Sequence, residues 1–264
     1  MKILIGADIV PTETNFDIFS SGNIEEIVDG DLLELFHSVD FRIFDLECVL
    51  SDRPDNMIKC GPRLLAPPEA INGISKLGID LLTIANKHIM DGGKTGLFDT
   101  IKAIKEKNIH YIGAGENVKE AAKPYLIDKD CKIGVYACAE HEFSIAGDST
   151  PGANPADLLT VFDDVAELKK QVDHVIVLYH GGREHYRYPS PRLQKICRKL
   201  IDAGASLVLT QHSHCIGCEE KYQNGIIVYG QGNFIFDKSE NEFRNSGLLL
   251  KTDFAKDGFS VEYV

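Results

Sequence analysis

The sequence lacks any run of about 18 consecutive apolar residues, the length that a membrane-spanning helix needs. The apolar stretch within Met1–Asp8 is too short for a secretion signal. Basic residues are also scarce, because 28 Lys and Arg stand against 40 Asp and Glu and give a formal net charge of −12. Such a charge opposes binding to nucleic acid or anionic lipid. We therefore expect a cytoplasmic chain without a membrane segment and without a nucleic-acid partner.

The seven cysteines do not suggest a disulfide framework. Their number is odd, and several lie inside apolar runs, as is typical of small buried side chains. Reduced thiols fit this pattern better than disulfides. Cys215 and Cys218 form a CxxC pair, but the sequence has neither a second pair at zinc-ribbon spacing nor a thioredoxin-like context. We assign the pair to packing and keep metal ligation as the alternative.

What the chain does have is enough apolar material for a sizeable core. Its 264 residues are 44% hydrophobic and 26% charged, close to the average for soluble globular chains. No repeat, low-complexity tract or linker divides the sequence, so we predict one domain over residues 1–264. Apolar runs that end in polar residues alternate with helical patterns, which indicates α/β layers. Strands are expected at residues 2–8, 41–46, 80–85, 110–113, 131–137, 174–179, 207–210, 226–229, 247–252 and 260–263, and helices at 24–36, 68–77, 95–107, 155–171 and 191–203.

Two segments rich in Pro, Gly and polar residues, 54–68 and 141–153, are predicted to be long loops. Long loops in a compact domain are often functional. Gly78 and Gly204 follow helical patterns, where a left-handed helix cap favours glycine. These two helix ends are therefore the clearest boundaries in the sequence.

Residues that can bind a metal or transfer a proton follow five of the predicted strands. In open α/β folds ligands gather at the carboxyl ends of strands, so these residues should converge in space. A single Asp or His at such a position is more often a helix cap or an ordinary hydrogen-bonded residue. The coincidence of five strand ends carries the prediction. The residues are Asp8, Asp45, Glu47, Asn86, Lys87, His88, Asp91, His180, Glu184, His212 and His214.

His212 and His214 form the most specific local element. Alternate residues of an extended segment point the same way, so the two rings can hold one ion jointly. Mixed Asp, Glu and His donors suit Zn²⁺, Mn²⁺ or Fe²⁺ better than an all-oxygen Ca²⁺ site. Two such ions a few ångströms apart activate water for hydrolysis at neutral pH. The pattern thus indicates a dinuclear hydrolase.

The order and spacing of these motifs resemble the CapA family of capsule-synthesis or poly-γ-glutamate-synthesis proteins over nearly the whole chain. Asp45-Leu46-Glu47 stands where the family has Asn-Leu-Glu, and Ala85-Asn86-Lys87-His88 opens a block similar to Ala-Asn-Asn-His-x-x-Asp-x-Gly. The other matching blocks are Gly6-Ala7-Asp8, residues 63–69, the remainder of 78–117, His180-Gly181-Gly182-Arg183-Glu184, residues 211–214 and residues 229–234.

The resemblance implies a four-layer α/β/β/α sandwich of the metallophosphoesterase (calcineurin-like) type, with a site where strand ends meet. It implies one or two divalent ions, Mn, Zn, Fe or Mg, and a bridging position for Glu47. His88 takes the place of the histidine that protonates a leaving group or steadies an oxyanion. The residues so assigned are the metal ligands Asp8, Glu47, His180, His212 and His214, the catalytic residues His88, Lys87 and Asp91, and the substrate-binding residues Arg63, Asn86, Glu184 and Asn233.

Two positions depart from the metallophosphoesterase pattern. Lys87 replaces a metal-binding asparagine, and Val10 stands where the first motif has a histidine. A protonated lysine has no lone pair, so it repels a cation and can occupy the charge position of one ion. A mononuclear centre is the alternative to a two-metal site, with Asn86 reaching the metal if the turn shifts by one residue.

Three functions fit these residues. The first is a capsule-synthesis or poly-γ-glutamate-synthesis protein that acts as a metal-dependent hydrolase or transferase on an anionic γ-glutamyl or phosphoester substrate. The second is a non-catalytic capsule-assembly or polymer-binding protein with a degenerate metal site. A nucleotidase or phosphodiesterase rests on fold analogy alone. The expected partner is an anionic small molecule or a γ-glutamyl polymer, admitted to the acidic protein by the metal, Arg63 and Lys87. Members of the family are often membrane-anchored, and the oligomeric state is left open.

Overall fold

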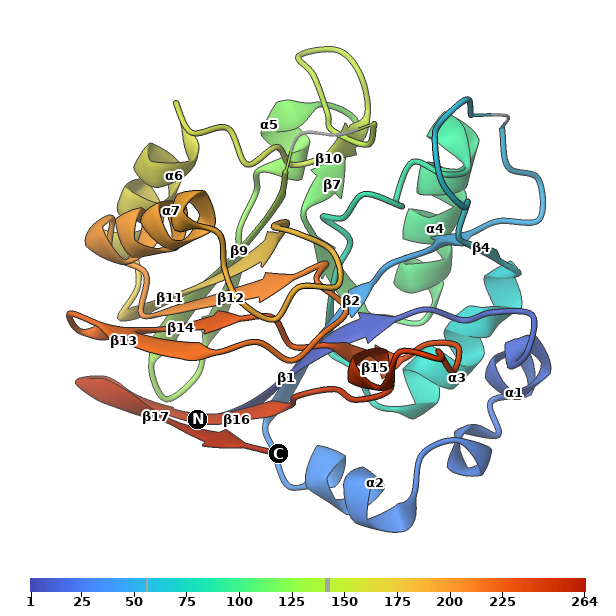
Figure 1. The fold of residues 1–264 in the computed structure, drawn as a ribbon, viewed down its shortest axis with the longest axis horizontal. Coiled ribbons are helices and arrows are strands. Elements are labelled where there is room, and N and C mark those ends of the chain that lie inside the picture. Colours follow the sequence, from blue (N-terminus) through green and yellow to red (C-terminus); the bar gives the residue numbers. More distant parts are fainter. Residues whose placement is uncertain (56, 141–142) are drawn as a thin grey trace.

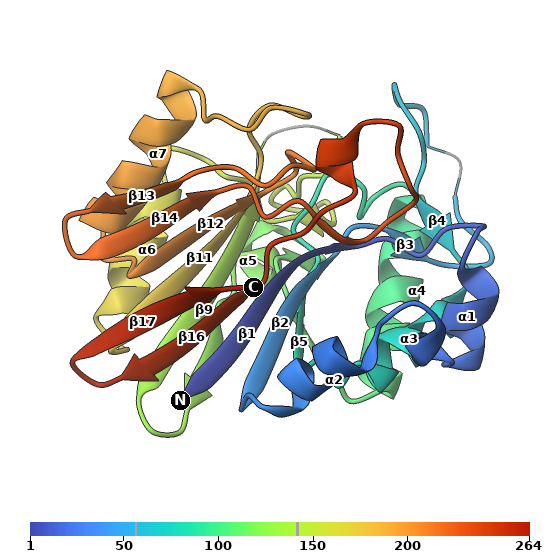
Figure 2. The same cartoon turned by 60° about the horizontal axis from the view of Figure 1, so that its bottom comes forward.

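The computed structural model describes residues 1–264 except 56, 141 and 142, and two β-sheets lie face to face at its centre (Figures 1 and 2). The first sheet is antiparallel at one edge, where β17 pairs with β16 and β16 pairs with β1, and it is parallel from β1 onward. A short strand, β15, lies parallel to the end of β1. In spatial order the strands are β17 (Gly258–Tyr263), β16 (Leu250–Ala255), β1 (Lys2–Ile9), β2 (Phe41–Leu46), β5 (Leu81–Thr83) and β6 (His110–Ile112), with β15 (Asn233–Ile235) beside β1.

The second sheet has four parallel central strands and an antiparallel strand at each edge. In spatial order its strands are β13 (Glu219–Tyr222), β14 (Gly225–Tyr229), β12 (Leu207–Gln211), β11 (His174–His180), β9 (Lys132–Ala139) and β8 (Tyr125–Asp128). Two short ladders flank the sheets: β3 (Val49–Leu50) with β4 (Leu65–Ala66), and β7 (Ala114–Gly115) with β10 (Gly152–Ala153).

Alternation along the strands sets up the layers. Ile3 and Ile5 of β1 pack between the two sheets, whereas Leu4 packs into the helical layer on the other face. Because both faces are covered, the strand reads as a nearly continuous apolar run. Helices cover the outer face of each sheet and give four layers, α/β/β/α, as predicted (Figure 2). The first sheet carries α1 (Phe16–Ser21), α2 (Gly30–His37), α3 (Ile71–Lys76) and α4 (Gly93–Glu106), and the second carries α6 (Val161–Lys169) and α7 (Pro191–Asp202).

The remaining helical turns are short. They are α5 (Val118–Ala121) and the 3₁₀ turns η1 (Ile24–Glu26), η2 (Pro68–Ala70) and η3 (Glu242–Arg244). None of the helices in the described part of the chain is long and apolar enough to cross a membrane.

The expected helix at 24–36 is wrong as a single element. The structure has η1, then a break, then α2, because the Asp29 side chain accepts a hydrogen bond from Leu32 N at 2.9 Å and caps a new helix there. The helix expected from residue 155 begins only at Val161, since Asp157 forms a turn by accepting from Leu159 N. Gly78 and Gly204 have positive φ, as their cap positions require.

The two predicted loops are only partly irregular. Residues 65–66 of the first form β4, and 152–153 of the second form β10. Positions 56, 141 and 142 of these loops lie outside the described residues.

Candidate metal centre and its cavity

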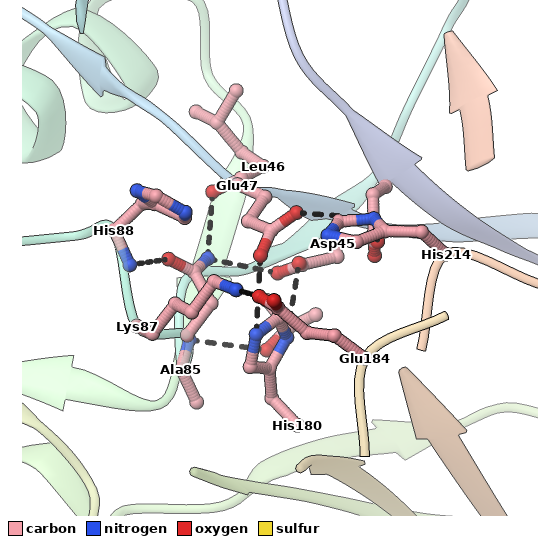
Figure 3. A network of polar contacts seen from close by, with 12 residues as sticks. Asp45, Leu46, Glu47, Ala85, Lys87, His88, His180, Glu184 and His214 are labelled. Carbon is pink, nitrogen blue, oxygen red and sulfur yellow. Dashed lines mark hydrogen bonds and ion pairs between the residues drawn. The ribbon is translucent and has the colours of Figure 1, made fainter. Parts of the chain in front are cut away.

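The carboxyl ends of the central strands of both sheets meet at one edge and bring polar side chains together (Figures 1 and 3). Asp8, near the end of β1, is the register partner of Asp45 on β2. Glu47 follows β2, and His180 ends β11. Strand β12, which pairs with β11, leads directly into His212 and His214. The five residues assigned as metal ligands therefore converge, although they span most of the sequence.

Glu47 lies between two histidines. Its Oε1 is 3.2 Å from His180 Nε2, and its Oε2 is 4.0 Å from His214 Nδ1. His180 Nδ1 lies 3.6 Å from Asp45 Oδ2, and His214 Nδ1 lies 3.4 Å from Asp8 Oδ2. Figure 3 shows the Glu47 carboxylate directed toward both rings. This central place suits a carboxylate that bridges two ligand sets.

Three overlapping groups of donors lie close enough to hold a metal ion, with the ligand atoms of each group within 4.8 Å of one another. Asp45 is the member that the sequence reasoning left out of the ligand set, although it had flagged this residue as a strand-end acid. None of the groups found among the described residues includes a cysteine, and Cys215 is buried, which agrees with a packing role. The groups are Glu47, His180 and His212; Asp8, Glu47 and His214; and Asp8, Asp45 and His180. The expectation that His212 and His214 hold one ion jointly is wrong for these groups, because the two residues have positive φ rather than extended backbone and fall in different groups.

Burial makes these donors costly without a cation. Asp8, Asp45 and Glu47 are all 0% exposed. Both carboxylate oxygens of Asp8 and of Glu47, together with His212 Nδ1, lack a hydrogen-bond partner among the described residues. The 3.2 Å contact of Glu47 with His180 is within ion-pair reach but lacks hydrogen-bond geometry. Buried charges whose hydrogen bonds are not made are costly even when an ion-pair partner is near, so the donor set fits a divalent cation that neutralises it.

In the protein without a cation, protons take over part of this neutralisation. Burial raises the pKa of Asp8, and it raises the pKa of Asp45 to about 7. Burial alone would lower the pKa of His180, but its contacts with Asp45 and Glu47 raise that pKa to about 10. Burial would likewise raise the pKa of Glu47, yet His180 outweighs it and lowers that pKa. His212 is the exception, because burial and the neighbouring cationic His180 lower its pKa to about 2. A neutral imidazole is the form that ligates a metal.

Lys87 brings a cationic side chain to the edge of this cluster. Its Nζ forms an ion pair with Glu184, from the loop after β11 (Figure 3). The positive charge of Lys87 contributes to the lowered pKa of His212. Val10, the other departure from the metallophosphoesterase pattern, is 0% exposed and packs in the core. If the cluster offers two ion positions, the Lys87 ammonium therefore lies near one of them.

Asn86 is fully buried and bonds to the protein at both ends of its amide. Its Nδ2 donates to Asp45 Oδ1 at 3.1 Å and to Leu46 O at 2.8 Å, and its Oδ1 accepts from His88 N. Asn86 therefore positions Asp45 and His88, and the contact with substrate expected of it stays a prediction.

His88 belongs to a second polar group beside the metal cluster. Its Nδ1 is 2.6 Å from Asp91 Oδ2, and Lys59 Nζ donates to Asp91 Oδ1 at 2.5 Å. Lys59 Nζ also lies 3.3 Å from His88 Nδ1. All three side chains are almost completely buried. Lys59 was not among the predicted site residues, because it comes from a loop without a periodic pattern. Its positive charge was the only feature of the sequence that pointed to it.

The remaining predicted substrate contacts fall in different places. Glu184 lines the cavity and pairs with Lys87. Asn233 Oδ1 is 2.8 Å from His214 Nδ1, so this side chain orients a candidate ligand. Arg63 donates to the backbone carbonyls of Asp91 and Asp55, at 2.8 and 2.9 Å, and is not among the described residues that line the cavity. With these contacts Arg63 holds the loop in place. Its predicted role as an anion clamp stays a prediction.

A cavity of about 780 Å³ opens onto this candidate metal-binding cluster. His88, His212 and His214 form part of its wall. Among the described residues, the lining has one carboxylate, that of Glu184, and four cationic side chains: Lys59, Lys87, Arg183 and Arg244. The cavity is therefore a cationic site in a protein of net charge −12.

The four layers form an α/β/β/α sandwich of the calcineurin-like fold type. Two solved structures share it over the full length of this chain. One is a hypothetical protein from Thermus thermophilus, with a TM-score of 0.60, 11% identity and 99% of that chain covered. The other is a novel phosphatase from Mycoplasma pneumoniae, with a TM-score of 0.58, 12% identity and 92% covered. At this identity the likeness concerns the fold alone.

Sequence comparison identifies the family. The family model for the bacterial capsule synthesis protein PGA_cap matches residues 3–238, so the chain belongs to this family. It is 34% identical to the capsule biosynthesis protein CapA of Bacillus anthracis over 194 residues, which are 70% of this chain and 47% of that protein. It is 30% identical to the PGA biosynthesis protein CapA of Bacillus subtilis strain 168 over 185 residues, 69% of this chain and 49% of that protein. The chain spans about half the length of these curated relatives.

Proposed function

We propose that this protein is a metal-dependent hydrolase or transferase that acts on an anionic γ-glutamyl or phosphoester substrate in capsule or poly-γ-glutamate synthesis. The observation that carries the proposal is the buried set of carboxylates and imidazoles around Glu47, whose oxygens have no described hydrogen-bond partner. The names of the capsule-related relatives support the γ-glutamyl substrate, and the metallophosphoesterase fold supports the phosphoester.

One or two divalent ions held by donors from these groups, with Glu47 shared between two of the groups, would polarise the reacting carbonyl or phosphoryl oxygen and activate water. The mixed carboxylate and imidazole donors indicate a preference for borderline ions, but they do not select one metal among Mn, Zn, Fe and Mg. Asn86 and Asn233 would hold Asp45 and His214 in place.

His88 is placed to transfer a proton. Asp91 fixes its Nδ1, which leaves Nε2 as the nitrogen available to a ligand in the cavity. In this role Nε2 gives a proton to the leaving amine or alkoxide as the bond to it breaks. Lys59 Nζ donates to the other carboxylate oxygen of Asp91 and so holds this carboxylate toward His88.

The test begins with the metal. The chain is purified with and without added Mn²⁺ or Zn²⁺, its metal content is measured by mass spectrometry, and turnover is followed on phosphoesters and γ-glutamyl peptides. We expect about one ion per chain and turnover that disappears with H212A or H214A. H37A removes an exposed histidine at the end of α2 and serves as the matched control. No bound metal and no turnover, with no effect of either variant, would refute the proposal.

The ion pair of Lys87 with Glu184 favours a second candidate, a capsule-assembly or polymer-binding protein that recognises its ligand without turnover. The Lys87 ammonium supplies positive charge at a position where two-metal enzymes hold an ion. Calorimetry with poly-γ-glutamate fragments separates the two: binding unaffected by a chelator supports recognition alone, whereas binding that requires metal supports the hydrolase.

A further inference from the structure

The four cationic side chains that line the cavity differ in what they contact. Lys59 donates to Asp91, and Lys87 pairs with Glu184. Arg183 and Arg244 form no ion pair within the described parts of the chain; their guanidinium groups lie over the rings of Tyr186 and Phe236, with 4.9 and 5.7 Å to the ring centroids. The two lysines are therefore engaged by carboxylates, while the two arginines keep their capacity to bind an anion.

Arg244 is fixed relative to the metal cluster. Its backbone carbonyl accepts a hydrogen bond from Asn233 Nδ2 at 2.9 Å, and the same amide contacts His214 Nδ1 through Oδ1 at 2.8 Å. Phe236, beneath the guanidinium, also lies beside the His214 ring, with centroids 5.7 Å apart. A hydrogen bond and a shared aromatic neighbour thus connect Arg244 to a candidate metal ligand.

The Arg244 guanidinium has an unmet donor. Its Nε is buried and has no hydrogen-bond partner among the described residues. A desolvated N–H without an acceptor is unfavourable, and an anion that enters the cavity removes the penalty. The planar guanidinium matches a carboxylate or a phosphate with two parallel hydrogen bonds. Arg183 lines the same cavity from the loop after β11, so two separate segments of the chain contribute an arginine to its lining.

We propose that Arg183 and Arg244 form a second anion-binding subsite, which holds an acidic group of the substrate other than the one that reacts at the metal centre. The inference rests on the proposed function, since it places the reacting group near His212 and His214. The cavity of about 780 Å³ has room for both groups, because pockets of roughly 300–1,000 Å³ hold ligands of drug size. The substrate class is therefore a molecule with two or more carboxylates or phosphates, not a simple monoester.

Calorimetry of the Mn²⁺-loaded chain tests the subsite with three probes. Tri-γ-glutamate and pyrophosphate each carry several acidic groups, and inorganic phosphate is the single-anion control. We expect R183A and R244A each to weaken binding of a multi-anionic probe by about tenfold, while phosphate and Mn²⁺ bind as before. The probe whose affinity falls in these variants shows whether the subsite prefers a carboxylate or a phosphate.

Two control variants complete the design. R192A removes the same charge from an exposed arginine that lines a different hollow, and it should leave all affinities unchanged. R244K keeps the charge but not the planar fork, so we expect an intermediate loss. Mn²⁺ stoichiometry and melting temperature are measured for each variant to establish that it is folded.

The subsite and the proposed function fail in different ways. Unchanged affinity of folded R183A and R244A for both multi-anionic probes overturns the subsite, as does the absence of any binding of these probes to the unsubstituted chain. A chain that binds no metal and has no turnover overturns the proposed function. In that case a loss of tri-γ-glutamate affinity in R244A, measured with a chelator present, still supports the subsite.

Discussion

Lys87 gives the sharpest test of how many ions the site holds. Its ammonium pairs with Glu184 and lies close enough to His212 to lower the pKa of that imidazole. The Lys87 side chain is 15% exposed and that of Glu184 is 43% exposed, so water screens the pair only in part. We expect the unsubstituted chain to bind one divalent ion and the K87N variant to bind two.

The magnitude follows from Coulomb's law. An ammonium about 5 Å from a divalent ion repels it by about 7 kcal/mol at an effective dielectric constant of about 20. The Glu184 carboxylate offsets part of this repulsion, and a remainder of about 3 kcal/mol weakens binding of a second ion by on the order of 100-fold. Asparagine removes the charge and supplies an oxygen ligand, so both effects favour the second ion.

The assay is metal content by mass spectrometry after gel filtration, combined with calorimetric titration of Mn²⁺. The K87M variant is the matched control, because it removes the charge without adding a ligand; it should bind one ion, more tightly than the unsubstituted chain. Two ions in the unsubstituted chain, or one ion in a K87N variant with an unchanged melting temperature, would show that Lys87 does not exclude an ion.

Three further outcomes follow from the structure. Mn²⁺ at 100 times its Kd should stabilise the fold by about 2.7 kcal/mol, which corresponds to a rise in melting temperature of about 5–10 °C. In calorimetric scans the H214A variant should lose most of that rise. K59M should lower kcat about 10- to 100-fold at unchanged metal content, whereas K102M, at an exposed site on α4, should not. G217A should cost about 3 kcal/mol or more in urea unfolding, since its Cβ would lie 1.4 Å from Tyr229 O, while G258A, with no neighbour within 4 Å, should cost under about 1 kcal/mol.

The strand-end residues were predictable because the topology of the sheets dictates their place. Asp8 and His180 lie at the ends of apolar runs, and parallel strands deliver their carboxyl ends to one edge. Asp45 was expected as a strand-end acid but not as a metal ligand, although it is the register partner of Asp8. The alternation of strands and helices predicted α/β layers, and the family resemblance implied their four-layer arrangement.

Contacts made by irregular segments were not predictable in the same way. Lys59 and Arg63 are both basic residues of one loop, and no periodicity says which of them faces the cavity. The structure has Lys59 on Asp91 at the cavity wall and Arg63 on backbone carbonyls. Similarly, the break between η1 and α2 depends on a single capping contact of Asp29, which competes with a continuous apolar pattern.

The contrast between the acidic protein and its cationic cavity bears on the form of the ligand. Exposed charges act over about 8–10 Å at physiological ionic strength, so a long polyanion lying across the surface meets the repulsion of a chain with net charge −12. A group inside the cavity is instead within reach of Lys59, Arg183 and Arg244. A short anionic molecule, or the end of a polymer, gains the attraction without most of the repulsion. Under the proposed function, the distribution of charge therefore favours a chain end over the middle of a polymer as the ligand.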